Sequence, residues 1–321
     1  PSDFPSFRFS PERRRKKNVS SSKRASTKLR FQERWRNFAL TTYHSPSQSM
    51  EKVILLTGAS SGIGYATAEL LARQGHKVYG AARRVEQLEP LAAVGVKALR
   101  LDVTSNESTE AAVAEIIRAE GSIDVLVNNA GYGSYGAVED VPIDEARRQF
   151  EVNLFGLARL VQCVLPHMRR RQSGTIVNVA SMGGHFTVCF GAWYHATKYA
   201  LEAFSDALRM ETRPFGIQVA IIEPGAIKTP WGDIAADHLE ESARGGAYAT
   251  QAGAAAAALR RLYHGARLSD PAVVAKAIGR AVNARRPNTR YRVGFGAKPL
   301  VLLHTLLPTR WFDYFMTRAF R

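Results

Sequence analysis

Apolar residues fall in short uninterrupted runs that alternate with longer amphipathic stretches from residue 50 onward. Six of these runs have the length of a strand, at 52–57, 77–81, 97–101, 123–127, 175–179 and 218–222. Because the apolar residues within a run do not alternate with polar ones, both faces of each predicted strand should be buried. Helical patterns lie between the runs, at 63–74, 107–120, 143–171 and 193–213. The alternation predicts βαβ units, and therefore an α/β fold with a doubly wound parallel sheet and helices on both faces.

The alternation stops after residue 225. Residues 226–268 predict a long loop, of the kind that covers a substrate, and 271–283 predicts one further helix. Residues 296–321 are apolar and aromatic, so we expect them to pack on the domain as an extension. A peripheral membrane surface or a substrate-access surface is the alternative for this segment. The predicted folded domain is a single unit at 50–295.

Composition excludes several classes of protein. The chain has 321 residues, 45% of them hydrophobic and 22% charged, which is ordinary for a globular protein. No stretch is long and apolar enough to predict a membrane-spanning helix. The two cysteines, Cys163 and Cys189, lack CxxC spacing, so neither a disulfide framework nor a metal site is expected. Low cysteine use favours a reducing compartment, and we predict a cytoplasmic location.

The positive charge is concentrated at the start of the chain. The formal net charge is +16, and residues 1–49 hold 12 Lys/Arg against 3 Asp/Glu. Apolar residues are sparse there, so the segment predicts a disordered tail. It suits a natural start at Met50 with an unrelated extension before it, an organelle-targeting segment, or a contact with nucleic acid or an anionic membrane. We expect no nucleic-acid binding by the folded body.

A glycine-rich turn, TGASSGIG at 57–64, joins the first predicted strand to the first helix. Glycines let the backbone turn tightly and approach a pyrophosphate, and the N-terminus of a helix offers free N–H groups to it. The turn therefore predicts a dinucleotide site. The expected contacts are Gly58, Ser60, Ser61, Gly62, Ile63 and Gly64.

Arginines follow the second predicted strand. Arg83 lies 19 residues after Gly64, next to Arg84, and no acidic residue precedes it on the strand. A carboxylate at this place would accept from a ribose 2′-hydroxyl, whereas arginine accommodates a 2′-phosphate. The pair predicts NADP(H) rather than NAD(H) as the cofactor. A solvated pair that opens the next helix is the alternative.

A tyrosine and a lysine share one face of a predicted helix. Tyr194 and Lys198 are spaced i, i+4, and Ser181 follows the strand at 175–179. An ammonium group near a phenol should lower the pKa of the phenol and make it a usable acid or base near neutral pH. A serine hydroxyl at a strand end can steady a carbonyl oxygen while the phenol protonates it.

With these motifs in their order along the chain, residues 50–295 resemble the short-chain dehydrogenase/reductase family. Besides TGASSGIG, the matching pieces are Asp102-Val103, Asn128-Asn129-Ala130-Gly131, Asn153, Ser181, Tyr194 with Lys198, and Pro224-Gly225 with Thr229. The resemblance implies a Rossmann-like sheet of about seven strands. It also implies a homo-oligomer, commonly a dimer or a tetramer.

The resemblance also implies roles for individual residues. Tyr194 would be the catalytic acid/base, Ser181 would position the substrate carbonyl, Lys198 would hold the nicotinamide ribose, and Asn153 would hold a water in a proton relay. The further cofactor contacts would be Asp102, Val103, Asn129, Ala130, Gly131, Pro224, Gly225, Ile227 and Thr229, in addition to Tyr194 and Lys198.

The expected reaction interconverts a small hydrophobic alcohol and its ketone or aldehyde, with NADP(H). Within the family the chain resembles the branch of 17β-hydroxysteroid and retinol dehydrogenases. The predicted substrate contacts, apart from Ser181, are Tyr135, His185, Phe186, Trp193 and Trp231. One alternative is a 3-oxoacyl carrier-protein reductase, and another, from a different class, is a non-enzymatic NADP-binding sensor or scaffold.

Overall fold

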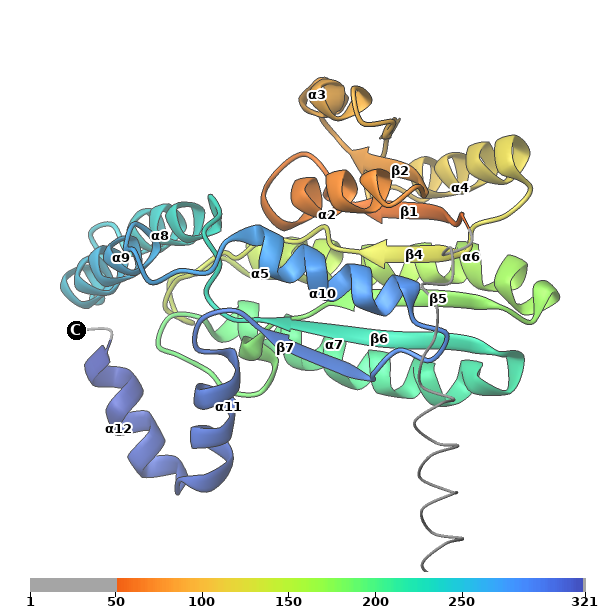
Figure 1. Ribbon diagram of the computed structural model, residues 1–321. Coiled ribbons are helices and arrows are strands. Elements are labelled where there is room, and N and C mark those ends of the chain that lie inside the picture. Colours follow the sequence, from red (N-terminus) through yellow and green to blue (C-terminus); the bar gives the residue numbers. More distant parts are fainter. Residues whose placement is uncertain (1–50, 320–321) are drawn as a thin grey trace, which may run out of the picture. The chain divides into compact units, whose positions relative to one another are not determined.

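Seven parallel strands form one sheet in residues 51–319, the part of the chain that this computed structural model describes (Figure 1). The strand order is β3-β2-β1-β4-β5-β6-β7. Since β1 has β2 on one side and β4 on the other, the winding reverses there and a crevice opens at the carboxyl ends of the strands. The predicted fold is confirmed; the tail predicted at 1–49 lies outside the described residues. The strands are β1 (Val53–Thr57), β2 (Lys77–Ala82), β3 (Lys97–Arg100), β4 (Val125–Asn128), β5 (Gly174–Val179), β6 (Ile217–Pro224) and β7 (Arg290–Val293).

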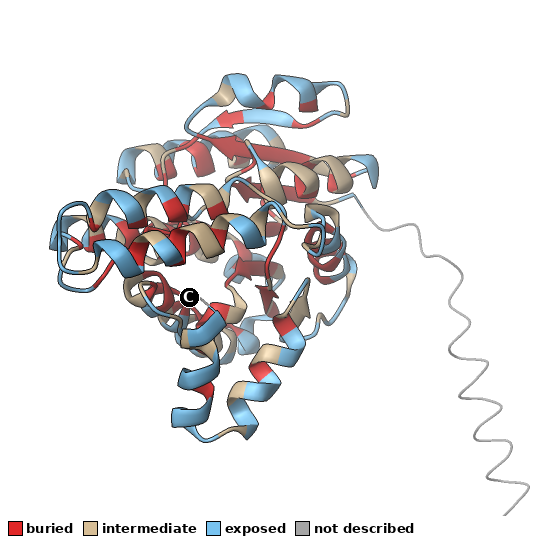
Figure 2. Cartoon of the chain, turned by 90° about the vertical axis from the view of Figure 1, so that its left-hand side faces the viewer, coloured by how far each residue is buried: buried red, intermediate tan, exposed pale blue. Residues whose placement is uncertain are grey.

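Helices cover both faces of the sheet, with the buried residues between the layers (Figure 2). Ile54 and Leu55 are neighbours on β1 and point to opposite faces. Ile54 packs with Leu71 of α2 and Ile278 of α10, whereas Leu55 packs with Leu160 of α6. The helices are α2 (Gly62–Arg73), α3 (Glu89–Ala92), α4 (Asn106–Glu120), α5 (Ile143–Phe150), α6 (Gly156–Arg171), α7 (Ala192–Thr212), α8 (Trp231–Ser242), α9 (Ala249–Tyr263), α10 (Pro271–Asn283), α11 (Ala297–Leu306) and α12 (Thr309–Ala319). Short turns are η1 (Val85–Leu88), η2 (Glu151–Phe155), η3 (Met182–Gly184) and η4 (Arg213–Phe215).

One helix and one edge strand differ from the sequence-based prediction. The single helix predicted at 143–171 is interrupted by η2, a π-helical turn that separates α5 from α6. β7 was missed, because its sequence RYRV carries no apolar run and its residues are only half-buried. Charged partners on β6 and α7 stabilise this strand, as described below.

The segment 226–268 is not the long loop that the sequence predicts. It contains α8 and α9, which pack on each other through small side chains. Ala252, Ala255 and Ala256 of α9 are buried in one cluster with Ala235 and Ala236 of α8. The Ala-rich stretch is therefore a close helix–helix contact. Figure 1 shows the two helices together, beyond the carboxyl ends of the strands.

The C-terminal segment forms two further helices, α11 and α12, which are joined at Pro308. Val301 and Phe312 are buried with Phe186 in a small cluster of their own. The expected packing on the domain is thus observed on one side of the pair. Within residues 51–319, no helix is both long and apolar enough to span a membrane.

Candidate active site

A cavity of about 1070 Å³ lies where the strands end, lined by the turns that follow β1, β2, β4, β5 and β6 and by parts of α8, α9, α11 and α12. Most of the predicted cofactor contacts line it: Gly58, Ser60, Ser61, Gly62, Ile63, Arg83, Arg84, Asp102, Val103, Asn129, Ala130, Gly131, Tyr194, Lys198, Pro224, Gly225, Ile227 and Thr229. Ser181, Tyr135, Phe186 and Trp231 line it as well. Gly64, Asn153, His185 and Trp193 do not.

The glycine turn is held in shape by backbone contacts. Gly58 has a φ of +67°, in the left-handed region that favours glycine. A Cβ on Gly64 would lie 2.0 Å from the carbonyl oxygen of Gly58, so only glycine fits there. The side-chain amide of Asn129 donates to the carbonyl oxygens of Thr57 at 3.0 Å and of Gly58 at 3.1 Å. Gly64 and Asn129 therefore shape the turn from behind, and α2 begins at Gly62 with its N-terminus at the cavity.

Positive charge lies at the end of β2. Arg83 and Arg84 are both exposed and line the cavity. Burial alone would raise the pKa of Asp102, but hydrogen bonds from the backbone and side chain of Thr104, together with the charge of Arg83, lower it. The cavity wall thus carries two guanidinium groups near the place where the sequence predicts a 2′-phosphate. Asp102 does not cap α4, since the N-cap is Ser105.

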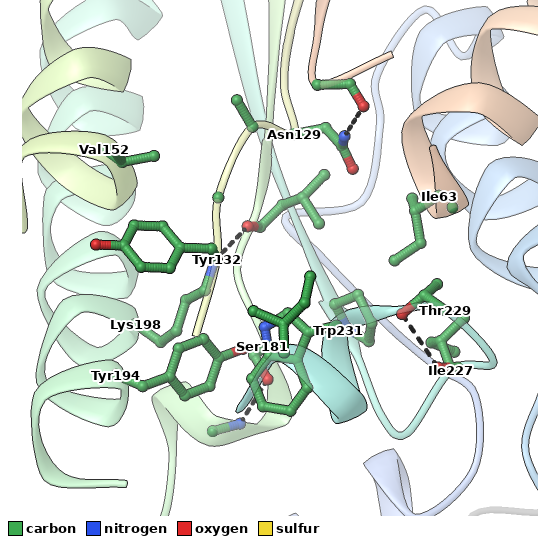
Figure 3. A pocket seen from close by; sticks show the side chains of 18 of the residues that line it. Ile63, Asn129, Tyr132, Val152, Ser181, Tyr194, Lys198, Ile227, Thr229 and Trp231 are labelled. Carbon is green, nitrogen blue, oxygen red and sulfur yellow. Dashed lines mark hydrogen bonds between the residues drawn. The ribbon is translucent and has the colours of Figure 1, made fainter. Parts of the chain in front are cut away.

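Tyr194 and Lys198 lie one turn apart on α7, with Ser181 beside the phenol at the start of the loop that follows β5 (Figure 3). Burial raises the pKa of Tyr194 to about 12, and hydrogen bonding to Ser181 acts in the opposite direction. The phenol is therefore protonated at neutral pH. We expected the ammonium of Lys198 to lower the pKa of the Tyr194 phenol, and this is not met. Burial of the phenol disfavours its charged form more than the neighbouring polar groups favour that form.

Lys198 is buried at the floor of the cavity. Its Nζ donates to the carbonyl oxygen of Val179 at 3.1 Å and lies 5.8 Å from the centroid of the Tyr194 ring. Burial lowers the pKa of Lys198 to about 8, while the charge of Glu202 acts to raise it. A lysine with this pKa changes its charge near neutral pH, unlike an exposed lysine.

Asn153 connects the elements around α7. It lies in the π-helical turn η2, a type of turn that is frequent at functional sites. Its Oδ1 accepts from the backbone N–H of Tyr132 at 3.0 Å, and its Nδ2 donates to the Tyr132 carbonyl at 2.9 Å and to Thr197 Oγ1 at 3.1 Å. The side chain therefore ties the loop after β4 to α7. Its predicted part in a proton relay stays a prediction.

Aromatic rings form the substrate half of the cavity. The ring of Trp231 lies 5.0 Å from that of Tyr194, 5.6 Å from that of Tyr135 and 5.7 Å from that of Tyr263, measured between centroids. Gly133 makes room for the indole, because a Cβ there would lie 2.4 Å from it. Sequence reasoning missed part of this wall. The missed residues are Leu259, Leu262 and Tyr263 on α9, Ile234 and His238 on α8, Leu300 on α11 and Met316 on α12. The helical spacing of those on α8 and α9 could have revealed them only if 226–268 had been predicted as helices.

Two predicted substrate contacts, Trp193 and His185, do not line the cavity. Trp193 is next to Tyr194 on α7, but it lines a separate hollow with Phe150 and Phe155. Successive residues of a helix point about 100° apart, so Trp193 and Tyr194 cannot share one wall. His195, the residue after Tyr194, is buried and does line the cavity; its Nδ1 lies 2.9 Å from the Gly183 carbonyl oxygen and its Nε2 lies 3.4 Å from the Tyr135 hydroxyl.

His185 points into a buried ionic cluster behind the cavity. Its Nε2 lies 3.2 Å from a carboxylate oxygen of Glu223. The Arg290 Nε lies 3.0 Å from the same carboxylate, and the Arg290 Nη2 lies 3.1 Å from a carboxylate oxygen of Glu202. Arg292 also pairs with Glu223. Burial, and then repulsion from Glu223, raise the pKa of Glu202 to about 7. The cluster connects α7, β6 and β7, which explains why a strand as polar as β7 joins the sheet.

The same cluster has the residue types of a metal site. One ligand-type atom each of His185, Glu202 and Glu223 lies within 4.8 Å of the others. However, the guanidinium groups of Arg290 and Arg292 already balance the two carboxylates. We therefore interpret the cluster as an internal ionic network of the protein.

The chain is a member of the short-chain dehydrogenase family, whose family pattern it matches over residues 52–238. It is 36% identical to a probable short-chain type dehydrogenase/reductase of Helicobacter pylori over 259 residues, which cover 81% of this chain and 94% of that protein. It is 42% identical to a 3-ketodihydrosphingosine reductase of Bacteroides thetaiotaomicron over 183 residues, 57% of this chain and 66% of that protein. An NADPH-dependent 1-acyldihydroxyacetone phosphate reductase of Schizosaccharomyces pombe is 38% identical over 181 residues, 56% of this chain and 61% of that protein.

Solved structures of the family are similar in fold. A short-chain dehydrogenase from Streptomyces avermitilis superposes with a TM-score of 0.69 at 38% identity, over 79% of this chain and 93% of that one. A serine dehydrogenase complexed with NADP+ gives 0.64 at 26% identity, over 75% and 94% of the two chains. A family member from Burkholderia phymatum in complex with NAD gives 0.68 at 26% identity, over 80% and 92%. Family membership makes the chain an oxidoreductase with a nicotinamide cofactor, and both forms of the cofactor occur among these relatives.

Proposed function

We propose that this oxidoreductase uses NADP(H) to interconvert a hydrophobic ketone or aldehyde and its alcohol, with Tyr194 as the proton donor. The observation that carries the proposal is the placement of the Tyr194 phenol, buried beside Ser181 and one helical turn from Lys198, at the floor of a cavity with aromatic walls. A nicotinamide cofactor supplies or accepts the hydride in this chemistry.

The residues around the nucleotide half fit such a cofactor. The N-terminus of α2 and the glycine turn offer N–H groups and space to a pyrophosphate, because Gly58 and Gly64 leave no side chain in the way. Arg83 and Arg84 would pair with a 2′-phosphate, which only NADP(H) carries. Thr229 and Ile227, on the opposite wall, would border the nicotinamide.

The catalytic residues divide the work on the substrate oxygen. Ser181 Oγ accepts a hydrogen bond from the Gly183 N–H at 3.0 Å, so its own O–H is available to a substrate carbonyl. The phenol of Tyr194, protonated at neutral pH, gives its proton to that oxygen during reduction. The positive charge of Lys198 favours the phenolate that this transfer leaves.

A ketone that carries a long acyl chain is the proposed substrate class. The substrate half is lined by Tyr135, Phe186, Trp231, Tyr263 and Met316, which suit an apolar chain rather than a sugar or an amino acid. The names of two relatives point the same way, since a 3-ketodihydrosphingosine reductase and a 1-acyldihydroxyacetone phosphate reductase both act on lipid ketones.

The test is reduction of a ketone series with NADPH and with NADH, followed by absorbance, for the full chain and for Tyr194→Phe. Positioned proton donors contribute about 10²–10⁴-fold, so Tyr194→Phe should lower kcat by at least about 10²-fold. Its Kd for NADPH should stay within a few-fold, because the nucleotide half is untouched. Tyr199→Phe, at an exposed tyrosine of the same helix, should keep full activity. Retention of more than about a tenth of the rate by Tyr194→Phe would place the proton donor elsewhere.

Assembly and location stay predictions from the sequence. We propose a homo-oligomer, a dimer or a tetramer, in the cytoplasm. Sedimentation of the full chain without vesicles measures the oligomeric state. The same measurement serves as a control in the vesicle experiment below.

A further inference from the structure

The α11–α12 hairpin has apolar side chains on both of its sides. On the inner side, Phe312 lies 5.4 Å from Phe186 and 4.8 Å from His304 between ring centroids, and Val301 is buried beside them. Leu300 and Met316 continue this inner side and line the substrate half of the cavity. The hairpin is therefore a wall of the cavity.

The outer side is equally apolar but exposed. On α11 the residues at spacing i, i+3, i+4 and i+7 are Pro299, Leu302, Leu303 and Leu306, and on α12 the same spacing gives Trp311, Tyr314, Phe315 and Arg318. We call the seven apolar members of these two sets the outer stripe. Leu306 is 70% exposed and Trp311 is 60% exposed. A row of large apolar side chains along a helix is normally covered, and nothing in residues 51–319 covers this stripe. Figure 2 shows the exposed outer side of the hairpin.

Positive charge accompanies the outer stripe. Lys298, Arg310 and Arg318 are exposed, and the guanidinium of Arg318 lies 4.9 Å from the centroid of the Tyr314 ring. Asp313 is the only acidic residue of the two helices, and it follows Phe312 on the side of α12 away from Trp311 and Phe315. The surface is thus apolar, aromatic and cationic.

We propose that the outer stripe docks on the surface of an anionic lipid bilayer, so that a lipid ketone passes from the bilayer into the cavity along the inner side of the same hairpin. The second half of this statement rests on the proposed function, and the first half does not. Trp and Tyr next to Arg and Lys are the composition of a membrane interface, where the rings sit at the headgroups and the cations meet anionic lipids. The core of an interface between two protein copies is also rich in aromatic residues and arginine but depleted in lysine, so a second copy on this stripe is the outcome that the experiment below distinguishes.

The experiment measures sedimentation of the full chain with phosphatidylcholine vesicles, with and without phosphatidylglycerol. The first variant combines Leu303→Ser, Leu306→Ser, Trp311→Ser and Phe315→Ser, all at exposed positions whose loss should leave the melting temperature unchanged. It should lower the partition coefficient by at least about tenfold, because the apolar contact is lost. Met210→Ser, at an apolar side chain of α7 that is 63% exposed, is the matched control and should bind as the natural chain does.

A second variant tests the charge. Arg310→Gln with Arg318→Gln should lower partition into vesicles with phosphatidylglycerol by roughly 25-fold, since each of the two basic residues near an anionic surface contributes on the order of fivefold. Arg213→Gln, at an exposed arginine of η4, is the control. The 12 Lys/Arg of residues 1–49 are present in every variant, so their attraction to anionic vesicles cancels in the comparison.

Activity measurements test whether a lipid ketone passes from the bilayer into the cavity. The four-serine variant should reduce a water-soluble short ketone at the natural rate, and should lose about tenfold in the reduction of a long-chain ketone held in the vesicles. Tyr194→Phe should sediment as the natural chain does, so a failure of the proposed chemistry and a failure of docking are seen in different measurements. Unchanged sedimentation of the four-serine variant overturns the proposal. So does a four-serine variant that falls apart from a dimer into monomers without any change in vesicle binding, because a second copy then covers the stripe.

Discussion

The two halves of the cavity are built in different ways. The nucleotide half consists of short turns that directly follow β1, β2, β4 and β6, and backbone groups fix it: Asn129 holds the carbonyls of Thr57 and Gly58, and Gly64 touches Gly58. The substrate half consists of helices between 231 and 319, and side chains fix it, through the rings of Tyr135, Trp231 and Tyr263 and the alanines between α8 and α9.

The difference bears on how each half tolerates change. A backbone contact of the nucleotide half cannot move without shifting a strand, so a single added methyl group is expected to be severe there. A helix pair packed through side chains can repack around a different substrate, so the substrate half is where specificity can vary. Between them, Tyr194, Lys198 and Ser181 face both halves.

The same substitution in the two halves gives the sharpest contrast. Gly64→Ala puts a Cβ 2.0 Å from a backbone oxygen, so the turn must open, and we expect NADPH binding to weaken by at least about 10²-fold in a fluorescence titration. Gly253→Ala on α9 meets no atom within 4 Å and should raise the free energy of unfolding by about 0.5–1 kcal/mol. Equal NADPH affinities in the two variants would remove the contrast.

Lys198, between the two halves, should lower the free energy of unfolding when it is charged. Burial lowers its pKa from 10.5 to about 8, so between these values the unfolded chain binds more protons than the folded one. The charged lysine therefore destabilises the fold at pH 7, by roughly 3 kcal/mol, and the penalty fades as the pH rises from about 8 to about 10.5.

Lys198→Met should accordingly raise the free energy of unfolding at pH 7 by up to about 3 kcal/mol, measured by urea denaturation, while activity falls. The gain should shrink between about pH 8 and pH 10.5 and vanish above that range, where the lysine is neutral in both the folded and the unfolded chain. Lys276→Met, at an exposed lysine of α10, should change little at either pH. A less stable Lys198→Met at pH 7 would mean that the hydrogen bond to Val179 outweighs the desolvation of the ammonium.

Trp231 tests the independence of the substrate half. Trp231→Ala removes the ring that packs on Tyr135, Tyr194 and Tyr263, and should raise KM for a ketone by about tenfold. The Kd for NADPH should change by less than about twofold, because the nucleotide half is fixed by its own backbone. Trp311→Ala, at an exposed indole, should leave KM for a water-soluble ketone unchanged. Parallel losses of both affinities in Trp231→Ala would show that the halves are coupled.

Arg83 gives the smallest expected effect, since it is exposed and Arg84 stands beside it. Arg83→Asp should shift the ratio of NADPH to NADH affinity by roughly fivefold toward NADH, because a carboxylate repels a 2′-phosphate and accepts from a 2′-hydroxyl. Arg213→Asp is the control for a change of net charge. Tighter binding of NADH than of NADPH by the natural chain would contradict the assignment of the cofactor itself.

The sequence alone determined the features that depend only on residues close together along the chain. Six strands follow from uninterrupted apolar runs, the turn at 57–64 follows from its glycines, and the shared face of Tyr194 and Lys198 follows from helical spacing. Each of these signals is complete within one element, and the described structure has all of them.

Only the tertiary structure decided which element a side chain meets. Trp193 faces α5, His185 joins the carboxylates of β6 and α7, and β7 enters the sheet because its arginines meet those acids. The segment after β6 became α8 and α9 because alanines that look weakly apolar in sequence become a close contact when two helices present them to each other. Burial, which raised the pKa of Tyr194 where the i, i+4 lysine alone predicts a decrease, is likewise a property of the whole packed site, since desolvation depends on every group that excludes water from the phenol.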